Sequence, residues 1–154
     1  MSKETIMAML TKAYRDDGIL DKFEAFELIN AITKEAKFQT KNFTGEAGEA
    51  YAHRYYGGEL MPDGFKDYDI LSNDRRIQVK CRGTKSTPSV DGIQYKDAFD
   101  IIAVVTFNTE GFTGIIEITH DEFFANASRR KDKAKPCWSW SLPKHVLERD
   151  RIYV

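Results

Sequence analysis

The chain has 154 residues, of which 42% are hydrophobic and 12% aromatic, a composition that fits one globular domain with a small appendage and argues against disorder. The formal net charge of −1 does not by itself indicate a nucleic-acid partner. No apolar run approaches the roughly 20 residues that cross a bilayer, and the N-terminus has no signal-peptide pattern, so we expect a cytoplasmic protein without membrane contact.

The N-terminal part of the sequence predicts a helical hairpin. Residues 3–15 repeat apolar side chains at helical spacing, and Asp21 is suited to cap a second helix. We therefore expect two parts, an N-terminal helical hairpin over residues 1–40 and a main domain over residues 41–154.

The main domain is expected to open with a helix and a strand hairpin. Thr44 is suited to cap a helix that runs to about Tyr56, where two consecutive glycines would end it. Residues 68–71 and 76–82 have strand patterns and are separated by the turn-forming sequence Ser-Asn-Asp, so they predict a hairpin.

The second half of the main domain mixes strands and helices. Residues 99–107 are nearly continuously apolar and β-branched, which is typical of a central strand covered on both faces. Thr119 and Glu122 have the spacing of a capping box, and Trp138 and Trp140 are expected to pack in the core or on a partner rather than to stack on bases. The other expected elements are a strand over 113–119, a helix over 120–127, a basic loop over 129–135, a strand over 137–140 and a final short helix or turn. This order predicts an α/β fold around one sheet.

The expected hairpin brings three polar side chains together. Because side chains alternate along a strand, Gln78 and Lys80 share one face while their apolar neighbours point into the core. Asp69 lies on the partner strand, roughly level with them. Lys80 taken alone would be expected to lie in solvent, but a carboxylate and an amide on the same face indicate a site.

Two segments carry a family resemblance. The segment FTGEAGEAYAHRYYGG resembles the GxxGExxA helix of YraN-like proteins and Holliday-junction resolvases, and QVKCR resembles their EVK(T/S)R, with a QxK variant similar to that of Mrr-type restriction enzymes. Together with Asp69, over about residues 43–107, the chain resembles the PD-(D/E)xK nuclease superfamily. The resemblance implies a restriction-endonuclease-like core, with a mixed central β-sheet flanked by helices. Tyr68 stands where proline is common, and Gln78 replaces an acidic residue.

The resemblance implies a divalent-metal site with Glu49, Asp69, Gln78 and Lys80 as catalytic residues. Asp69 would bind Mg²⁺ directly, beside the carbonyl oxygens of the Gln78 side chain and the Val79 backbone, and Glu49 would bind through water or complete a second metal position. The metal would activate a water, and Lys80 would orient that water or neutralise developing charge. Since Gln78 is neutral, we expect weaker metal binding and a preference for Mn²⁺.

Other candidate ligands are less favoured. Glu46 lies three residues before Glu49 and could also face the sheet, but Glu49 occupies the GE position of the resembling motif. His53, one turn beyond Glu49, could touch the same site, although a surface histidine is the expectation. Cys81 and Cys137 lie far apart and the histidines are scattered, which argues against a zinc site and against a disulfide.

Charge is unevenly distributed along the chain. Residues 46–74 carry seven acids and two bases, a balance of −5, and residues 75–96 carry six bases and one acid, a balance of +5. Residues 129–151 carry eight bases and three acids, again a balance of +5. This pattern fits a phosphodiester-cleaving site, in which carboxylates bind a metal and cations bind the phosphates. A surface of mixed charge would give the same pattern. The expected DNA contacts are Arg82, Lys85, Arg129, Arg130 and Lys131.

Two classes of function follow from these expectations. The first is a divalent-metal-dependent endonuclease that hydrolyses DNA, of restriction, repair or junction-resolving type. The second is a catalytically degenerate nuclease fold that binds DNA or a protein partner, which the neutral Gln78 and the near-neutral net charge favour. RNA stays open as a substrate, because attack by water is indifferent to the sugar. Cutting both strands of a duplex often requires two sites, which leaves a homodimer open.

Overall fold

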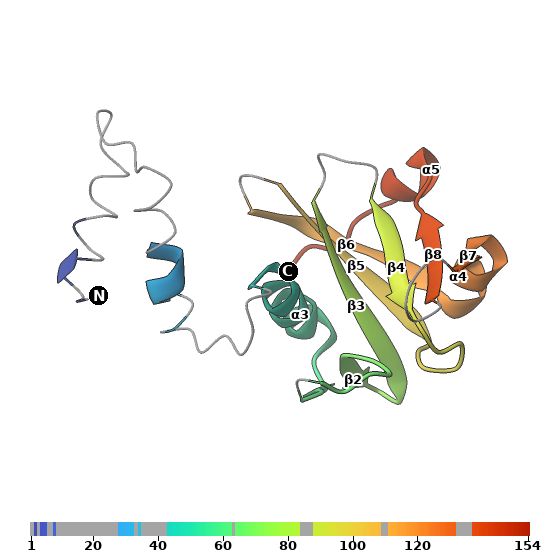
Figure 1. The fold of residues 1–154 in the computed structure, drawn as a ribbon, viewed down its shortest axis with the longest axis horizontal. Coiled ribbons are helices and arrows are strands. Elements are labelled where there is room, and N and C mark those ends of the chain that lie inside the picture. Colours follow the sequence, from blue (N-terminus) through green and yellow to red (C-terminus); the bar gives the residue numbers. More distant parts are fainter. Residues whose placement is uncertain are drawn as a thin grey trace. The chain divides into compact units, whose positions relative to one another are not determined.

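The computed structural model divides the chain into two compact units, Met1–Phe43 and Thr44–Val154. The described residues are 2, 4–5, 8, 28–32, 34, 43–62, 64–83, 88–108, 111–131 and 137–154. The described residues of the first unit, except residue 2, have helical backbone, and the rest of the expected N-terminal hairpin lies outside the described residues. Figure 1 shows the second unit as a layered structure of strands and helices.

The second unit is a mixed α/β fold with two sheets. Its described elements are α3 (Phe43–Tyr56), β1 (Glu59–Leu60), β2 (Ile70–Ser72), β3 (Arg75–Gly83), β4 (Ser89–Ile93), β5 (Ile101–Asn108), β6 (Gly111–Thr119), α4 (His120–Asn126), β7 (Ser128–Arg130), β8 (Cys137–Ser141) and α5 (Lys144–Leu147). One sheet has the strand order β1-β2-β3-β5-β6, and the other has the order β4-β8-β7. In the first sheet β3 and β5 run parallel and the other neighbours antiparallel, so the sheet is mixed, as expected.

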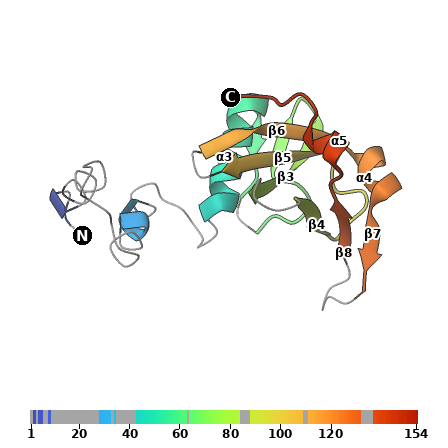
Figure 2. The same ribbon diagram turned by 90° about the horizontal axis from the view of Figure 1, so that it is seen from above.

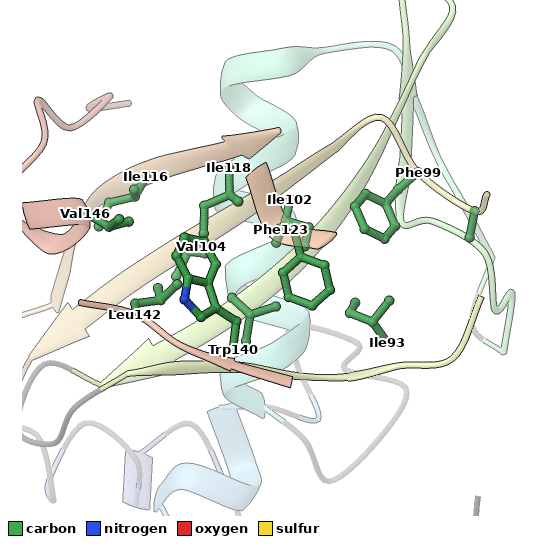
Figure 3. Close-up of a cluster of buried hydrophobic side chains, with 12 residues drawn as sticks. Ile93, Phe99, Ile102, Val104, Ile116, Ile118, Phe123, Trp140, Leu142 and Val146 are labelled. Atoms are coloured by element: carbon green, nitrogen blue, oxygen red, sulfur yellow. The ribbon is translucent and has the colours of Figure 1, made fainter. Parts of the chain in front are cut away.

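Strand β5 lies at the centre of the fold and is covered on both faces, which confirms the prediction from its apolar sequence. Ile102 and Val104 belong to a buried cluster that also contains Trp140, with Trp138 packed against it. Figure 3 shows Trp140 beside this face of the sheet. Val105, on the other face, packs in a second cluster with residues of α3. Both tryptophans thus pack on the core, which is one of the two alternatives expected for them.

The second sheet corrects the expectation of a single sheet. The five-stranded sheet has α3 on one face, whereas β4, β8, α4 and α5 contribute to the core on the other face (Figures 1 and 2). Strand β4 lies between two expected strands, in a segment for which no strand was predicted, and β7 lies partly in the expected basic loop. In β4 only Val90 and Ile93 are buried, and β7 buries no side chain, so neither strand shows an apolar repeat.

The expected hairpin forms, with boundaries shifted by one or two residues. It consists of β2 and β3, paired from Ser72 and Arg75 at the turn to Ile70 and Ile77. The two residues of the turn, which follow Ser72, have φ angles of 49° and 61°. This left-handed backbone is typical of a type I′ turn, and Asn and Asp tolerate it well.

The helix boundaries agree with the sequence in most details. Helix α3 begins at Phe43, one residue before the expected cap Thr44. The Thr119 hydroxyl accepts the Glu122 N–H at 3.2 Å, which confirms this cap of α4. The Glu122 carboxylate accepts hydrogen bonds from the Arg149 guanidinium, so this side chain is used to hold the C-terminal segment against α4. None of the helices in the described part of the chain is long and apolar enough to span a membrane.

The end of α3 is joined tightly to β2. The Gly57 N–H closes the helix on the His53 carbonyl at 2.8 Å, and the Ser72 hydroxyl donates to the Tyr56 carbonyl at 2.6 Å. Gly58 has a φ of +79°, and an added Cβ would lie 2.2 Å from the Leu71 carbonyl oxygen. Only glycine therefore lets the chain pass this close to β2.

Replacing Gly58 with alanine is expected to destabilise the domain more than replacing Gly57. Both glycines have left-handed backbones, but an added Cβ at Gly57 would meet no atom within 4 Å. We expect Gly57→Ala to lower the free energy of unfolding by about 1–2 kcal/mol, the cost of the left-handed backbone. Gly58→Ala should lower it further, because the β2 backbone must move. Urea unfolding measures both, and equal losses would contradict the close approach.

Candidate metal centre

The candidate site lies where β2 separates from β3. The register pairs Ile70 with Ile77, and the N–H of the preceding residue, Asp69, donates to the Ile77 carbonyl at 2.9 Å. Two residues of one strand therefore face one residue of the other, which is the arrangement of a β-bulge. A bulge re-aims a side chain or ends strand pairing. Asp69 is the residue at which the hairpin opens.

The Asp69 carboxylate bridges to β3 at this opening. Its Oδ2 accepts the Val79 N–H at 2.6 Å and also accepts the side-chain amide of Gln78. Because the N–H and C=O of one strand residue point to the same edge, the Val79 carbonyl points to the edge where Asp69 lies. Both hydrogen bonds end on Oδ2, which leaves Oδ1 as the oxygen with which Asp69 can bind a further ligand.

Three oxygen donors can therefore meet at this edge. They are the Asp69 carboxylate, the Val79 carbonyl and, after rotation of its amide, the Gln78 side-chain carbonyl. No group of three or more His, Cys, Asp or Glu side chains suited to a metal occurs in the described ranges. The donor set here is of a different kind, with one carboxylate and two neutral oxygens. It fits a hard cation such as Mg²⁺, which takes carboxylate and carbonyl oxygens and keeps several waters.

Burial governs the electrostatics of Asp69. It raises the pKa of this carboxyl group above its usual range, while the Val79 N–H, the Lys80 charge and the Gln78 amide act in the opposite direction. A nearby cation stabilises the charged form of a carboxylate that has been removed from water in this way. The environment of Asp69 is thus suited to hold a positive ligand.

Gln78 and Lys80 lie on the face of β3 that the second sheet covers. The register places Gln78 beside Ile102 and Lys80 beside Val104, both members of the buried cluster on that face. Burial lowers the pKa of the Lys80 ammonium, and the Asp69 carboxylate is the strongest of the charges that raise it. The solvent-exposed lysine expected from the strand alone is therefore not what the structure shows: Lys80 is half-buried beside apolar side chains.

Glu49 approaches the site from the other face of β3. Its helix, α3, packs on the side of Cys81: an added Cβ on Gly48 would lie 2.9 Å from both Cβ and Sγ of Cys81. The Glu49 charge raises the pKa of Lys80, less than Asp69 does. Hydrogen bonds therefore join Asp69 to Gln78 and Val79. The charge of Asp69 acts on Lys80, and the charge of Glu49 acts on Lys80 more weakly.

Helix α3 carries all three candidate residues, Glu46, Glu49 and His53. The charge of Glu49 is among those that raise the pKa of Lys80. The His53 Nε2 lies 3.1 Å from the Gly58 carbonyl oxygen, at the end of the helix. Glu49 is therefore a residue of α3 whose charge acts on the hairpin site.

The expected DNA contacts differ in their surroundings. Arg82 Nε donates to the Ser89 carbonyl at 2.5 Å, and its Nη2 lies 2.8 Å from the Asp91 carboxylate, so this side chain fastens β4 to β3. The other described candidates are exposed on β7 or directly after it, namely Arg129, Arg130 and Lys131. Lys85 lies outside the described residues.

A cleft beside Gln78 and Lys80 includes residues that the sequence did not single out. It has a volume of about 270 Å³ and is lined by Phe65, Lys66, Asp67, Gln78, Lys80, Gly92, Ile93, Gln94, Tyr95, Ala98 and Phe99. Most of these come from the segment before β2 and from the segment between β4 and β5. Because β5 runs parallel to β3, the chain that connects them must return past β3, which brings the residues between β4 and β5 to Lys80. The apolar run of β5, typical of parallel strands, was the signal for this return.

Comparison with known proteins does not identify the chain. No protein-family model matches it, and no curated protein matches it at a significant level. The interpretation of the site therefore depends on its own geometry and chemistry.

Replacing Gln78 with glutamate is expected to strengthen divalent-metal binding. The change puts a second carboxylate beside Asp69, and affinity for hard cations rises with the number of charged ligands, so we expect Mg²⁺ to bind about tenfold or more tightly. Isothermal titration calorimetry measures the affinity. Asn126→Asp, the same chemical change at an exposed position of α4, should leave it unaltered. Equal affinities in the two variants would contradict the assignment.

Proposed function

We propose that the chain is a divalent-metal-dependent nuclease that hydrolyses phosphodiester bonds in DNA, built on a restriction-endonuclease-like core. One observation carries the proposal: the Asp69 carboxylate is bound to the Val79 N–H beside Gln78, and a half-buried Lys80 lies next to them. The resemblance of QVKCR and of the α3 segment to PD-(D/E)xK nucleases supports it. The fold supports the proposal as well, because the sheet is mixed and α3 comes before the β2–β3 hairpin in the chain.

In this proposal the residues of the β3 edge hold the metal. Asp69 and the carbonyl oxygens of Gln78 and Val79 would be its ligands, and Glu49 would contribute through water or at a second position. When bound, Mg²⁺ or Mn²⁺ supplies Lewis-acid polarisation of a phosphate oxygen and makes water more acidic. Asp69 fixes the position of this chemistry, because its carboxylate is already fastened to β3.

Lys80 supplies positive charge to the phosphate. Its ammonium group has three hydrogen-bond donors and lies between an apolar cluster and the cleft. A charge in such a low-dielectric place interacts more strongly than one in water, and it needs no reorganisation when negative charge develops on the phosphate. Lys80 would thereby position the phosphate beside Asp69.

A basic edge strand offers a second contact with DNA. Strand β7 is at the edge of the three-stranded sheet, and Arg129, Arg130 and Lys131 on or beside it are exposed. Side chains of this kind bind phosphates without reading the sequence of bases. They would contribute affinity, while the β3 edge performs the hydrolysis.

A second candidate is a nucleic-acid-binding protein without catalysis. The hydrogen bond from the Gln78 amide to Asp69 favours it, because the amide N–H then satisfies the carboxylate in place of a cation. In this case metal would not be required, and DNA would be bound intact.

Metal-dependent cleavage should depend on Asp69 and Lys80. We expect plasmid or branched DNA to be cut with Mg²⁺ or Mn²⁺ and to stay intact in EDTA. Asp69→Ala and Lys80→Ala should each lower the rate by about 100-fold or more, since each removes a charge that acts on the reacting phosphate. Gel electrophoresis of the products measures the rate.

Two further variants make this test specific. Asp69→Asn keeps an acceptor for the Val79 N–H, so it separates loss of charge from loss of fold. Lys144→Ala, at a lysine whose side chain is 87% exposed, should leave the rate unchanged. Cleavage that survives both Asp69→Asn and Lys80→Ala would eliminate the nuclease assignment, and DNA binding without any cleavage would favour the second candidate.

A further inference from the structure

The cleft at Lys80 combines positive charge with exposed aromatic rings. Lys66 and Lys80 line it together with one acid, Asp67. Phe65 and Tyr95 also line it, although 42% of Phe65 and 50% of Tyr95 are exposed. Exposed rings beside lysines are suited to a ligand that has both a flat aromatic part and a negative charge.

The segment that carries Tyr95 is held by hydrogen bonds at the two residues that follow it. The Lys96 carbonyl oxygen lies 2.8 Å from the His120 Nε2, and the Arg76 Nη1 donates to the Asp97 carbonyl at 2.5 Å. Tyr95 is nevertheless half exposed. Since its neighbours are held, the ring can receive a ligand without a large loss of backbone freedom.

The segment that carries Phe65 is also ordered by its own contacts. The Phe65 N–H donates to the Pro62 carbonyl at 3.1 Å, and its ring meets that of Tyr68 edge to face with the centroids 5.0 Å apart. Since a ring has two faces, Tyr68 covers at most one face of the Phe65 ring. Lys66, the next residue, is exposed beside it.

These features fit an unpaired nucleotide better than a base pair. A base stacked on an aromatic ring gains binding energy whatever its identity, because every base has an aromatic face. In a duplex each base face is covered by its neighbours, and exposing one costs a few kcal/mol. Single-stranded DNA has its bases accessible, and its phosphates can bind Lys66 and Lys80.

We propose that the cleft binds an unpaired nucleotide, with its base on Tyr95 or Phe65 and its phosphate at Lys66 and Lys80. The substrate class is therefore DNA with a single-stranded segment, such as a single strand, a flap or a branch, rather than blunt duplex. The inference rests on the proposed function, because the bound phosphate lies beside the residues assigned to hydrolysis.

Binding in EDTA tests the cleft apart from catalysis. The probes are a fluorescein-labelled 20-nucleotide single strand and the blunt duplex of the same sequence, and fluorescence anisotropy gives their affinities for the full chain. We expect the single strand to bind more tightly than the duplex. Tyr95→Ala should weaken binding of the single strand by about 5- to 150-fold, the range for one stacked base, and should change duplex binding by less than about twofold.

Tyr55→Ala is the matched control, because Tyr55 is 49% exposed and does not line the cleft. It should leave both affinities unchanged. Phe65→Ala removes the other exposed ring of the cleft, and its affinity for the single strand is measured in the same way. Unchanged binding of the single strand in both Tyr95→Ala and Phe65→Ala would overturn the inference, as would duplex binding as tight as that of the single strand.

Cleavage with Mn²⁺ separates this inference from the proposed function. Faster cutting of the single strand by the wild type, lost in Tyr95→Ala, would support both. Duplex cutting that Tyr95→Ala leaves unaltered would sustain the nuclease assignment and overturn the inference. Tyr95-dependent binding without cutting of any probe would support the cleft as a binding site and overturn the proposed function.

Discussion

The hydrogen bond from the Val79 N–H to the Asp69 carboxylate determines the rest of the candidate site. A buried backbone N–H without a partner costs about 1–3 kcal/mol, so the carboxylate at this position has a structural role as well as a chemical one. Beyond Ile77, the register gives β3 no β2 partner. Asp69 therefore ends the pairing and turns the edge of β3 toward a ligand, with the Val79 carbonyl and the Gln78 side chain beside it.

The second sheet gives this edge its electrostatic character. Strand β4 runs back over β3, where Arg82 binds both Ser89 and Asp91, and the cluster around Val104 is closed from water. Lys80 consequently lies between apolar side chains and a polar cleft, and its burial lowers its pKa. Covering the sheet and placing Lys80 in a low-dielectric environment, where any charge it carries interacts more strongly than in water, are thus two results of the same packing.

Local sequence patterns predicted the hairpin and the central strand well, because period-two alternation, turn-forming residues and a long apolar run act within a few residues. They also placed Gln78 and Lys80 on one face. They missed β4 and the cleft, whose apolar and aromatic residues are isolated in sequence and gain neighbours only through the parallel pairing of β3 with β5. Arg82 was expected to contact DNA phosphates, but it binds Ser89 on β4, a strand that the sequence did not predict. Glu49 lies on the opposite side of β3, because α3 packs against Cys81.

The central claim is that the opening of the β2–β3 hairpin binds a divalent cation, and Mn²⁺ titration followed by ¹⁵N NMR tests it most directly. Mn²⁺ broadens the signals of nearby nuclei. At substoichiometric Mn²⁺ the amide signals of Asp69, Val79 and Lys80 should broaden first, while those of Arg129 should persist. Broadening centred instead on exposed carboxylates such as Asp121, whose side chain is 99% exposed, or no selective broadening at all, would contradict the account.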